Sequence, residues 1–213
     1  MNMKKFSIVC EYLHSDIYEK IAEFNNKCNK FEYGLARNGI IDKSINTSYD
    51  DWKLWRMSSP SQFEKQGGGV CWDYVTYEAD YFKKNFPELK VTAYYIIFVN
   101  DKDNPTHTFI TINVDNKYVY FESSFKKIKG VYIFDTESDV LNFVMTKMNK
   151  YRPKGCEDLF RSSRKYKITK YNALDKKLIG CNIDQFMNYC YRAEVVDHRY
   201  SKKYNDPIIF TAF

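Results

Sequence analysis

The sequence predicts a single α+β domain in which helices accompany an antiparallel sheet. A helix is indicated by four apolar residues at i, i+4, i+7 and i+11, namely Val75, Ala79, Phe82 and Phe86. Runs rich in β-branched and aromatic residues follow at 91–99, 107–114 and 117–123, and such runs are typical of strands. With 213 residues, of which 44% are hydrophobic and 18% aromatic, the chain can bury one sizeable core.

The first part of the chain predicts one helix and then irregular structure. Residues 15–30 carry an apolar stripe at the same helical spacing, and Ser15 can cap the helix. Residues 31–60 contain glycine and proline residues that interrupt regular secondary structure, so we expect this region to be irregular, with a short helix from Asp50 to Trp55. We expect Trp52 and Trp55 to anchor the core.

The next helix should run from about Cys71 to Asn85, because Pro87 prevents it from continuing. After the three strands, residues 131–134 predict a fourth strand and residues 139–148 a helix that ends before Pro153. The remaining elements are expected to be a strand at 165–170, a helix at 184–191 and a closing strand or tail at 208–213.

Composition and charge disfavour several classes of protein. No apolar stretch approaches the roughly 18 residues of a membrane span, and the N-terminus lacks a signal-peptide pattern, so we expect a soluble, cytoplasmic protein. The net charge of +6 is spread out, with its densest cluster from Arg161 to Lys170. A solvated surface is therefore expected rather than a nucleic-acid face. Six cysteines without a CxxC pair predict reduced, mostly buried thiols.

Cys71 is the first candidate catalytic residue. Three glycines, Gly67 to Gly69, lead directly into this cysteine at the expected start of a helix. The positive end of a helix dipole favours a thiolate, which is the nucleophilic form of cysteine. Glycines allow the backbone to approach a substrate closely. The alternative is a buried structural thiol, the common fate of a free cysteine.

His107 is the expected base for this cysteine. A cysteine nucleophile needs a group that takes its proton, usually a histidine, and a third group that orients that base. The chain has three histidines, His14, His107 and His198, and only His107 begins a strand of the expected central sheet.

Glu122 is the expected orienting group. If Asp115-Asn116 is a two-residue hairpin turn, the residue numbers of each cross-strand pair add up to 231, so Phe109 lies opposite Glu122. Glu122 would share a face with His107 and lie diagonally within side-chain reach. A turn of different length would reverse this parity, and Ser123 or Ser124 would then be the alternative.

Gln66 is the fourth candidate, because an amide donor shortly before a nucleophile can help its backbone N–H to form an oxyanion hole. A phosphate-binding loop is not indicated, since no Lys-Ser/Thr follows the glycines. No metal or cofactor motif is recognised, so no cofactor is expected. Asp73 is expected to stabilise the helix, because a carboxylate in the first turn interacts favourably with the positive end of the helix dipole.

The order Cys71, His107, Glu122, from a helix start to two successive strands, resembles the transglutaminase-like branch of the papain-like cysteine enzymes. The Cys71-Trp72 pair with Gln66 upstream is similar to papain-type proteases, and the resemblance covers residues 60–125. It implies a papain-like (transglutaminase-like) fold, with the catalytic helix packed on an antiparallel sheet and a catalytic triad. Residues 1–60 and about 150–213 would be family-specific embellishments. Glutamate at position 122 departs from the commoner aspartate.

The expected function is a cysteine hydrolase, a thiol peptidase or amidase, that cleaves an amide or isopeptide bond of a protein or peptide through a thioester. Transglutaminase-type acyl transfer or deamidation is the alternative reaction. A non-catalytic protein-binding module and a nucleic-acid binder using Arg161 to Lys170 are the alternative classes. The sequence leaves the substrate, the oligomeric state and the role of the last 60 or so residues open.

Overall fold

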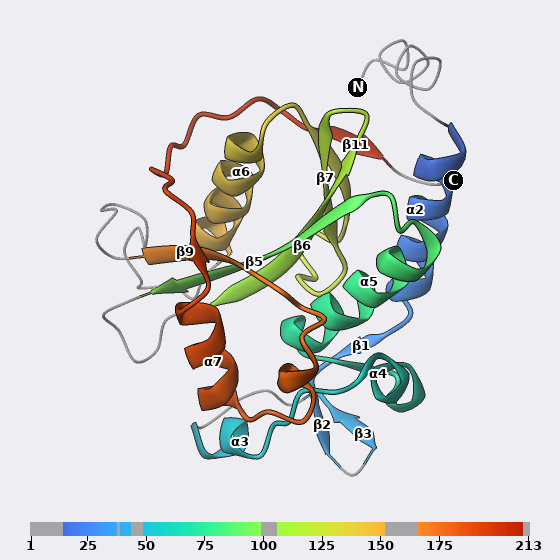
Figure 1. Ribbon diagram of the computed structural model, residues 1–213, viewed down its shortest axis with the longest axis vertical. Coiled ribbons are helices and arrows are strands. Elements are labelled where there is room, and N and C mark those ends of the chain that lie inside the picture. The colour runs from blue at the N-terminus through green and yellow to red at the C-terminus, as the bar shows by residue number, and fades with distance from the viewer. Residues whose placement is uncertain (1–14, 38, 44–48, 99–105, 152–165, 211–213) are drawn as a thin grey trace.

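A seven-stranded antiparallel sheet forms the centre of the computed structural model, which describes residues 15–37, 39–43, 49–98, 106–151 and 166–210 (Figure 1). The strand order is β10-β9-β5-β6-β7-β8-β11, so the strands next to one another in the middle are also consecutive in sequence. The strands of this sheet are β5 (Lys90–Phe98), β6 (His107–Val114), β7 (Lys117–Glu122), β8 (Gly130–Phe134), β9 (Tyr166–Tyr171), β10 (Glu194–Val195) and β11 (Ile208–Phe210).

Helices and short strands surround this sheet. The helices are α2 (Ser15–Cys28), α3 (Tyr49–Lys53), α4 (Pro60–Gln66), α5 (Cys71–Asn85), α6 (Glu137–Lys150), α7 (Ile183–Tyr191) and the 3-10 turn η1 (Lys176–Leu178). Two small sheets complete the described fold: β1 (Glu32–Tyr33) pairs in parallel with β4 (Gly68–Gly69), and β2 (Leu35–Arg37) pairs antiparallel with β3 (Ile40–Asp42).

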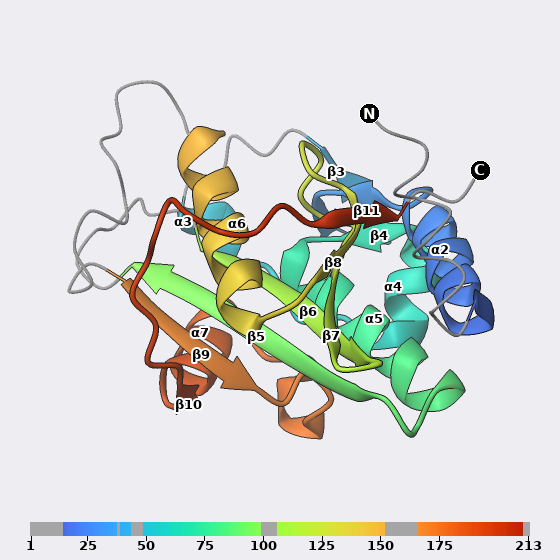
Figure 2. The same cartoon turned by 90° about the horizontal axis from the view of Figure 1, so that it is seen from above.

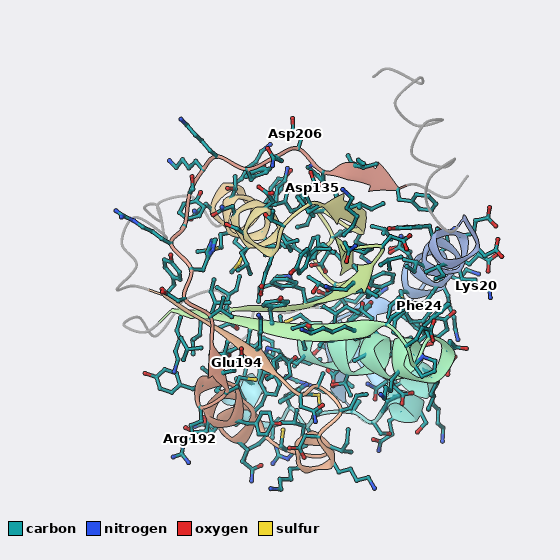
Figure 3. The ribbon with its side chains drawn as sticks, turned by 45° about the horizontal axis from the view of Figure 1, so that its top comes forward. Lys20, Phe24, Asp135, Arg192, Glu194 and Asp206 are labelled. Atoms are coloured by element: carbon teal, nitrogen blue, oxygen red, sulfur yellow. The ribbon has the colours of Figure 1, made fainter. Side chains whose placement is uncertain are left out.

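The two faces of the sheet carry two separate cores. Ile110 and Ile112 of β6 point to the face covered by α5, whereas Phe109, which directly precedes Ile110, points to the face covered by α6. In Figure 3, the yellow α6 lies on one side of the green strands and the teal α5 on the other. Because both faces are covered, β6 is almost continuously buried. The side that faces α5 is apolar at three of its four positions, whereas the side that faces α6 has Phe109 as its one apolar residue.

The predicted elements that carry the candidate site are confirmed. Helix α5 runs from Cys71 to Asn85 and strand β6 from His107 to Val114, with the bounds that the sequence indicates. Elsewhere within the described residues, the bounds of the predicted helices and strands differ by one or two residues. Helix α6 begins two residues before the predicted start because Thr136 caps it, its Oγ1 accepting a hydrogen bond from the Asp139 N–H at 3.1 Å.

The prediction of irregular structure for residues 31–60 is wrong in part, since this region contains the short strands β1, β2 and β3, whereas α3 confirms the short helix predicted from Asp50 to Trp55. Helix α4, which begins at Pro60, was also missed. Its start has a sequence signature: Ser59 Oγ accepts from the Gln62 N–H at 3.3 Å, and Gln62 Oε1 accepts from the Ser59 N–H at 2.9 Å. This is a reciprocal capping box with proline at the first helical position. The short strands have too few residues for a period-two pattern.

The C-terminal segment supplies strands to both ends of the main sheet. Strand β9 pairs with β5, and the chain then crosses α6 before β11 pairs with β8 (Figure 2). Asn142 of α6 holds this crossing, because its Oδ1 accepts from the Ser201 N–H at 2.8 Å and lies 3.0 Å from His198 Nε2. Among the described helices, none has the length and apolar character needed to cross a membrane.

Candidate active site

Cys71 is the first residue of α5 and lies at the wall of a cavity of about 1050 Å³ that His107 also lines. The residue before it, Val70, has extended backbone dihedrals, and its N–H donates to Asp73 Oδ2 at 3.1 Å. The cysteine residue is 7% exposed. The sulfur is therefore placed at the positive end of a 15-residue helix and beside a cavity.

Asp73 anchors the segment that leads into Cys71. Its carboxylate accepts from the Ser58 N–H at 2.8 Å and from Trp55 Nε1 at 3.0 Å, in addition to the Val70 N–H. Burial raises the pKa of Asp73 from 3.8 to about 6, against the opposite effect of these donors. The expected dipole role of Asp73 is thus accompanied by a second one, which is to tie the connection between α3 and α4 to the start of α5.

The triple glycine is required by contacts within the chain. Gly67 has φ +81° as the C-cap of α4, a left-handed conformation that favours glycine. A Cβ on Gly68, which has φ +147°, would lie 2.0 Å from the Glu32 carbonyl oxygen, and one on Gly69 would lie 2.6 Å from Asp73 Cβ. The close approach that we expected toward a substrate is therefore made toward β1 and Asp73 instead.

This packing brings Tyr33 to the cysteine. The parallel pairing of β1 with β4 places Tyr33 opposite Gly69, two residues before Cys71. Burial of the phenol raises the pKa of Tyr33 well above its ordinary value, and the neighbouring Cys71 thiol acts in the same direction. The phenol therefore lies close enough to Cys71 for the two groups to affect each other's electrostatics, although the Tyr33 residue as a whole is 38% exposed. Sequence reasoning missed Tyr33, since no local pattern connects it with Cys71.

The hairpin that carries the other two candidates has the predicted turn. Asp115 and Asn116 have φ values of 49° and 61°, as a two-residue type I′ turn requires, and Val114 pairs with Lys117. With that register, His107 Nε2 lies 2.7 Å from Glu122 Oε2. The predicted proximity of this histidine and this carboxylate is confirmed.

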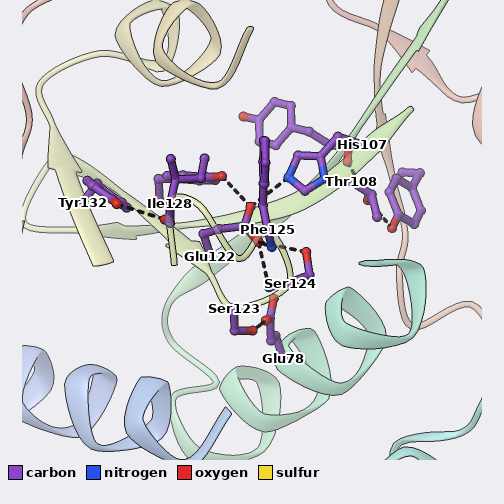
Figure 4. A network of polar contacts seen from close by, with 12 residues as sticks. Glu78, His107, Thr108, Glu122, Ser123, Ser124, Phe125, Ile128 and Tyr132 are labelled. Carbon is purple, nitrogen blue, oxygen red and sulfur yellow. Dashed lines mark hydrogen bonds and ion pairs between the residues drawn. The ribbon is translucent and has the colours of Figure 1, made fainter. Parts of the chain in front are cut away.

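Glu122 is held by a dense set of hydrogen-bond donors (Figure 4). One oxygen, Oε1, accepts from the Ser124 N–H and hydroxyl, both at 2.8 Å, and from the Phe125 N–H at 2.7 Å. The other oxygen accepts from the Tyr120 hydroxyl at 2.5 Å beside its contact with His107. Ser124, an alternative orienting group in the sequence, thus supports Glu122 instead of contacting the imidazole.

The electrostatics of this pair favour an imidazolium beside a carboxylate. Burial tends to lower the pKa of His107, but the charge of Glu122 and hydrogen bonds with Cys71 and Glu122 raise it from 6.5 to about 10. Burial tends to raise the pKa of Glu122, yet the His107 charge and the donors described above lower it overall. Since Nε2 faces Glu122, the other ring nitrogen is the one available to the Cys71 sulfur.

Gln66, the last residue of α4, supports the loop rather than the cavity. Its amide nitrogen donates to Ser58 Oγ at 2.9 Å and to the Gly68 carbonyl oxygen at 2.8 Å. Both amide hydrogens are engaged, and Gln66 is not among the residues that line the cavity. The structure therefore brings together Cys71, His107 and Glu122, and it places Gln66 behind the glycine turn.

A second buried carboxylate lies behind the site on the same helix. Glu78 is 2% exposed and accepts a hydrogen bond from the Ser123 hydroxyl (Figure 4). Burial raises the pKa of Glu78 well above its ordinary value, and the charge of Glu122 acts in the same direction. A protonated Glu78 leaves Glu122 as the ionised member of this pair of acids.

The remaining candidates lie away from the cavity or outside the described residues. His198 contacts Asn142 on the α6 side of the sheet, whereas His14 and residues 161–165 of the basic cluster lie outside the described residues. The four described cysteines are free and buried, as predicted. Trp55 is buried and packs against Trp72, with ring centroids 4.9 Å apart, which confirms its expected place in the core.

Comparison with known proteins gives no match: no protein-family model, no curated protein and no solved structure matches this chain. The mixed α+β architecture with a large antiparallel sheet is established by the structure. The resemblance to papain-like and transglutaminase-like enzymes stays a prediction from the residues.

Proposed function

We propose that the protein is a cysteine hydrolase, a peptidase or amidase that acts on an amide or isopeptide bond with Cys71, His107 and Glu122 as its triad. The observation that carries this proposal is the 2.7 Å contact between His107 and Glu122 beside the cavity that Cys71 lines. A catalytic imidazole needs an orienting carboxylate on one side and the nucleophile on the other. Glu122, His107 and Cys71 supply these three groups in that order.

In the proposed reaction, the Cys71 thiolate attacks the carbonyl carbon of the substrate, so that a C–S bond forms. Collapse of the tetrahedral intermediate breaks the C–N bond, and the His107 imidazolium gives its proton to the departing amine. Water then attacks the thioester while His107 accepts a proton from it. Collapse of this second tetrahedral intermediate breaks the C–S bond, so that the acid product leaves and the thiolate–imidazolium pair is restored. Glu122 keeps the imidazole in position and stabilises its charged form.

Two groups are proposed to stabilise the oxyanion. The Cys71 backbone N–H is the first of α5 and has no acceptor within the helix. The second is the Tyr33 hydroxyl, which lies near the same residue and would take the place that we expected for Gln66, whose amide is already bound. Donors aimed at the developing charge typically contribute about 3 kcal/mol of transition-state stabilisation.

The acceptor is proposed to be water, because hydrolysis needs no second binding site. The same thioester could pass its acyl group to an amine, so transglutaminase-type transfer shares the first half-reaction. Release of the free acid with no incorporation of added monodansylcadaverine would favour hydrolysis.

The proposal is tested by the rate at which iodoacetamide alkylates Cys71 at pH 6, followed by peptide mass mapping. Cys181 is an internal control, because it is also 7% exposed and burial raises its pKa to about 11. We expect Cys71 to react at least about ten-fold faster than Cys181 and than free cysteine.

Two histidine variants make the test specific. His107→Ala should abolish the fast reaction, whereas His198→Ala, which changes a histidine that contacts Asn142 and does not line the cavity, should leave it unchanged. If Cys71 reacts no faster than free cysteine, or if His107→Ala has no effect, the catalytic proposal fails and a binding module becomes the better interpretation.

A further inference from the structure

The cavity beside Cys71 contains an excess of cationic side chains. Four lysines line it, Lys43, Lys126, Lys127 and Lys129. The last three belong to the connection between β7 and β8, which begins immediately after Glu122. The residues that hold the triad carboxylate and the lysines of the cavity are therefore parts of one short loop.

The carboxylates at this cavity are already engaged. Glu32 lines the cavity and pairs with Lys43, with 2.6 Å between Oε1 and Nζ. Glu122 lies beneath the loop, 2% exposed, and faces His107. Within the described part of the chain, no carboxylate forms an ion pair with Lys126, Lys127 or Lys129.

The three lysines of the β7–β8 connection differ in exposure, but none of them forms an ion pair with a carboxylate of the described residues. Lys126 and Lys127 are exposed, whereas Lys129 is half-buried with its Nζ 5.9 Å from the centre of the Tyr74 ring. Burial lowers the pKa of Lys129, and the nearby charge of Lys126 acts in the same direction, although Glu122 and Glu78 oppose it. A cluster of like charges at the wall of a cavity creates a positive potential that attracts anions.

We infer that the cavity selects an acidic peptide, in which an Asp or Glu side chain lies next to the amide that Cys71 attacks. This inference rests on the proposed function. The lysines would bind the substrate carboxylates, and Phe31, Phe125, Met148 and Tyr151, which line the same cavity, would contact the aliphatic parts of the peptide. The site is thereby assigned a substrate class that its triad alone does not specify.

The inference is tested with two alkylating probes that differ in charge, iodoacetate and iodoacetamide. The measured quantity is the ratio of their rate constants at Cys71, divided by the same ratio for free cysteine. At about 10 mM salt we expect a normalised ratio of roughly three or more, which falls toward one at about 1 M salt because salt screens the lysines.

A double variant separates the lysines from the imidazolium of His107, which also attracts an anion. Lys126→Gln/Lys127→Gln should lower the ratio about three-fold while leaving the iodoacetamide rate unchanged. The matched control is Lys176→Gln/Lys177→Gln, an exposed pair that does not line the cavity, and it should keep the wild-type ratio. Fast iodoacetamide labelling together with an unaltered ratio in the Lys126/Lys127 variant would overturn this inference and leave the proposed function intact.

Protection experiments test the peptide itself. Acetyl-Glu-Gln-Glu-amide should slow iodoacetamide labelling of Cys71 at a concentration at least about three-fold lower than acetyl-Gln-Gln-Gln-amide does. Equal protection by both peptides, or stronger protection by a 20-residue oligothymidylate than by the acidic peptide, would overturn the assignment to acidic peptides. Slow labelling of wild-type Cys71 by both probes would overturn the proposed function as well.

Discussion

His107 reaches the Cys71 site on the β6–β7 hairpin, whereas Tyr33 reaches it on β1, a two-residue strand that pairs with β4. The hairpin is a local structure, in which the two turn residues Asp115 and Asn116 set the register and with it the face of each side chain. The β1–β4 junction joins segments more than 30 residues apart in the sequence. Their backbones approach so closely that a Cβ on Gly68 would overlap the Glu32 carbonyl oxygen.

The difference teaches how each region should respond to substitution. A hairpin turn tolerates other residues that adopt positive φ, because its side chains point into solvent. The junction tolerates no side chain where a backbone oxygen already occupies the space. We therefore expect the largest effects at the junction and the smallest at the turn.

The largest expected effect is that of Gly68→Ala, since its Cβ would lie 2.0 Å from the Glu32 oxygen at a φ of +147°. The free energy of unfolding, measured in urea, should fall by about 3–5 kcal/mol from overlap and backbone strain together. Gly67→Ala is the control, because its Cβ would meet nothing within 4 Å, and it should cost only about 1 kcal/mol. Equal losses in the two variants would show that overlap with β1 is unimportant.

Asp73→Ala should destabilise the chain by about 2–4 kcal/mol in the same measurement. The substitution removes the acceptor of the Ser58 and Val70 N–H groups and of the Trp55 indole, and buried donors without a partner cost roughly 1–3 kcal/mol each. Asp80→Ala is a matched control on the same helix, where the carboxylate pairs with an exposed lysine, and it should change stability by less than about 1 kcal/mol. A small loss for Asp73→Ala would mean that water replaces the carboxylate.

Glu122→Gln should cost roughly 2–3 kcal/mol near pH 6, because it leaves a buried imidazolium without its carboxylate. The pKa of His107 is raised from 6.5 to about 10, so the stabilisation by the pair is complete below about pH 6.5 and is lost as the pH rises toward 10. The lowered pKa of Glu122 means that its own contribution is lost only on acidification below its ordinary range. The difference in the free energy of unfolding between wild type and variant, measured in urea, should be smaller at pH 10 than at pH 6. A difference that does not change with pH would contradict the ion pair.

The smallest expected effect is that of Asn116→Gly, which should raise the unfolding free energy by about 0.5–1 kcal/mol. Glycine adopts the left-handed φ of 61° at this turn position without steric cost. The iodoacetamide rate of Cys71 should not change, since the register stays the same. An altered rate would show that the turn residue acts on the site by more than the register.

Two pieces of the candidate site could be predicted from sequence because their geometry is set locally. Helix α5 begins at Cys71 and ends before Pro87 by its own apolar spacing and stop signal. The parity of a two-residue turn places Glu122 on the face of His107 whatever the rest of the fold does. The sequence by itself thus determined the position of Cys71, the proposed nucleophile, at a helix start, the carboxylate partner of the His107 imidazole, and an α+β architecture.

Tertiary structure alone decided what surrounds that pair. Tyr33 comes to Cys71 through a strand of two residues, Gln66 turns its amide to Ser58 and Gly68, and three lysines of the β7–β8 connection line the cavity. These contacts join segments far apart in the chain, and no short-range periodicity encodes them. They depend on how closely packed backbones approach each other, and that distance is set only when the whole core is assembled.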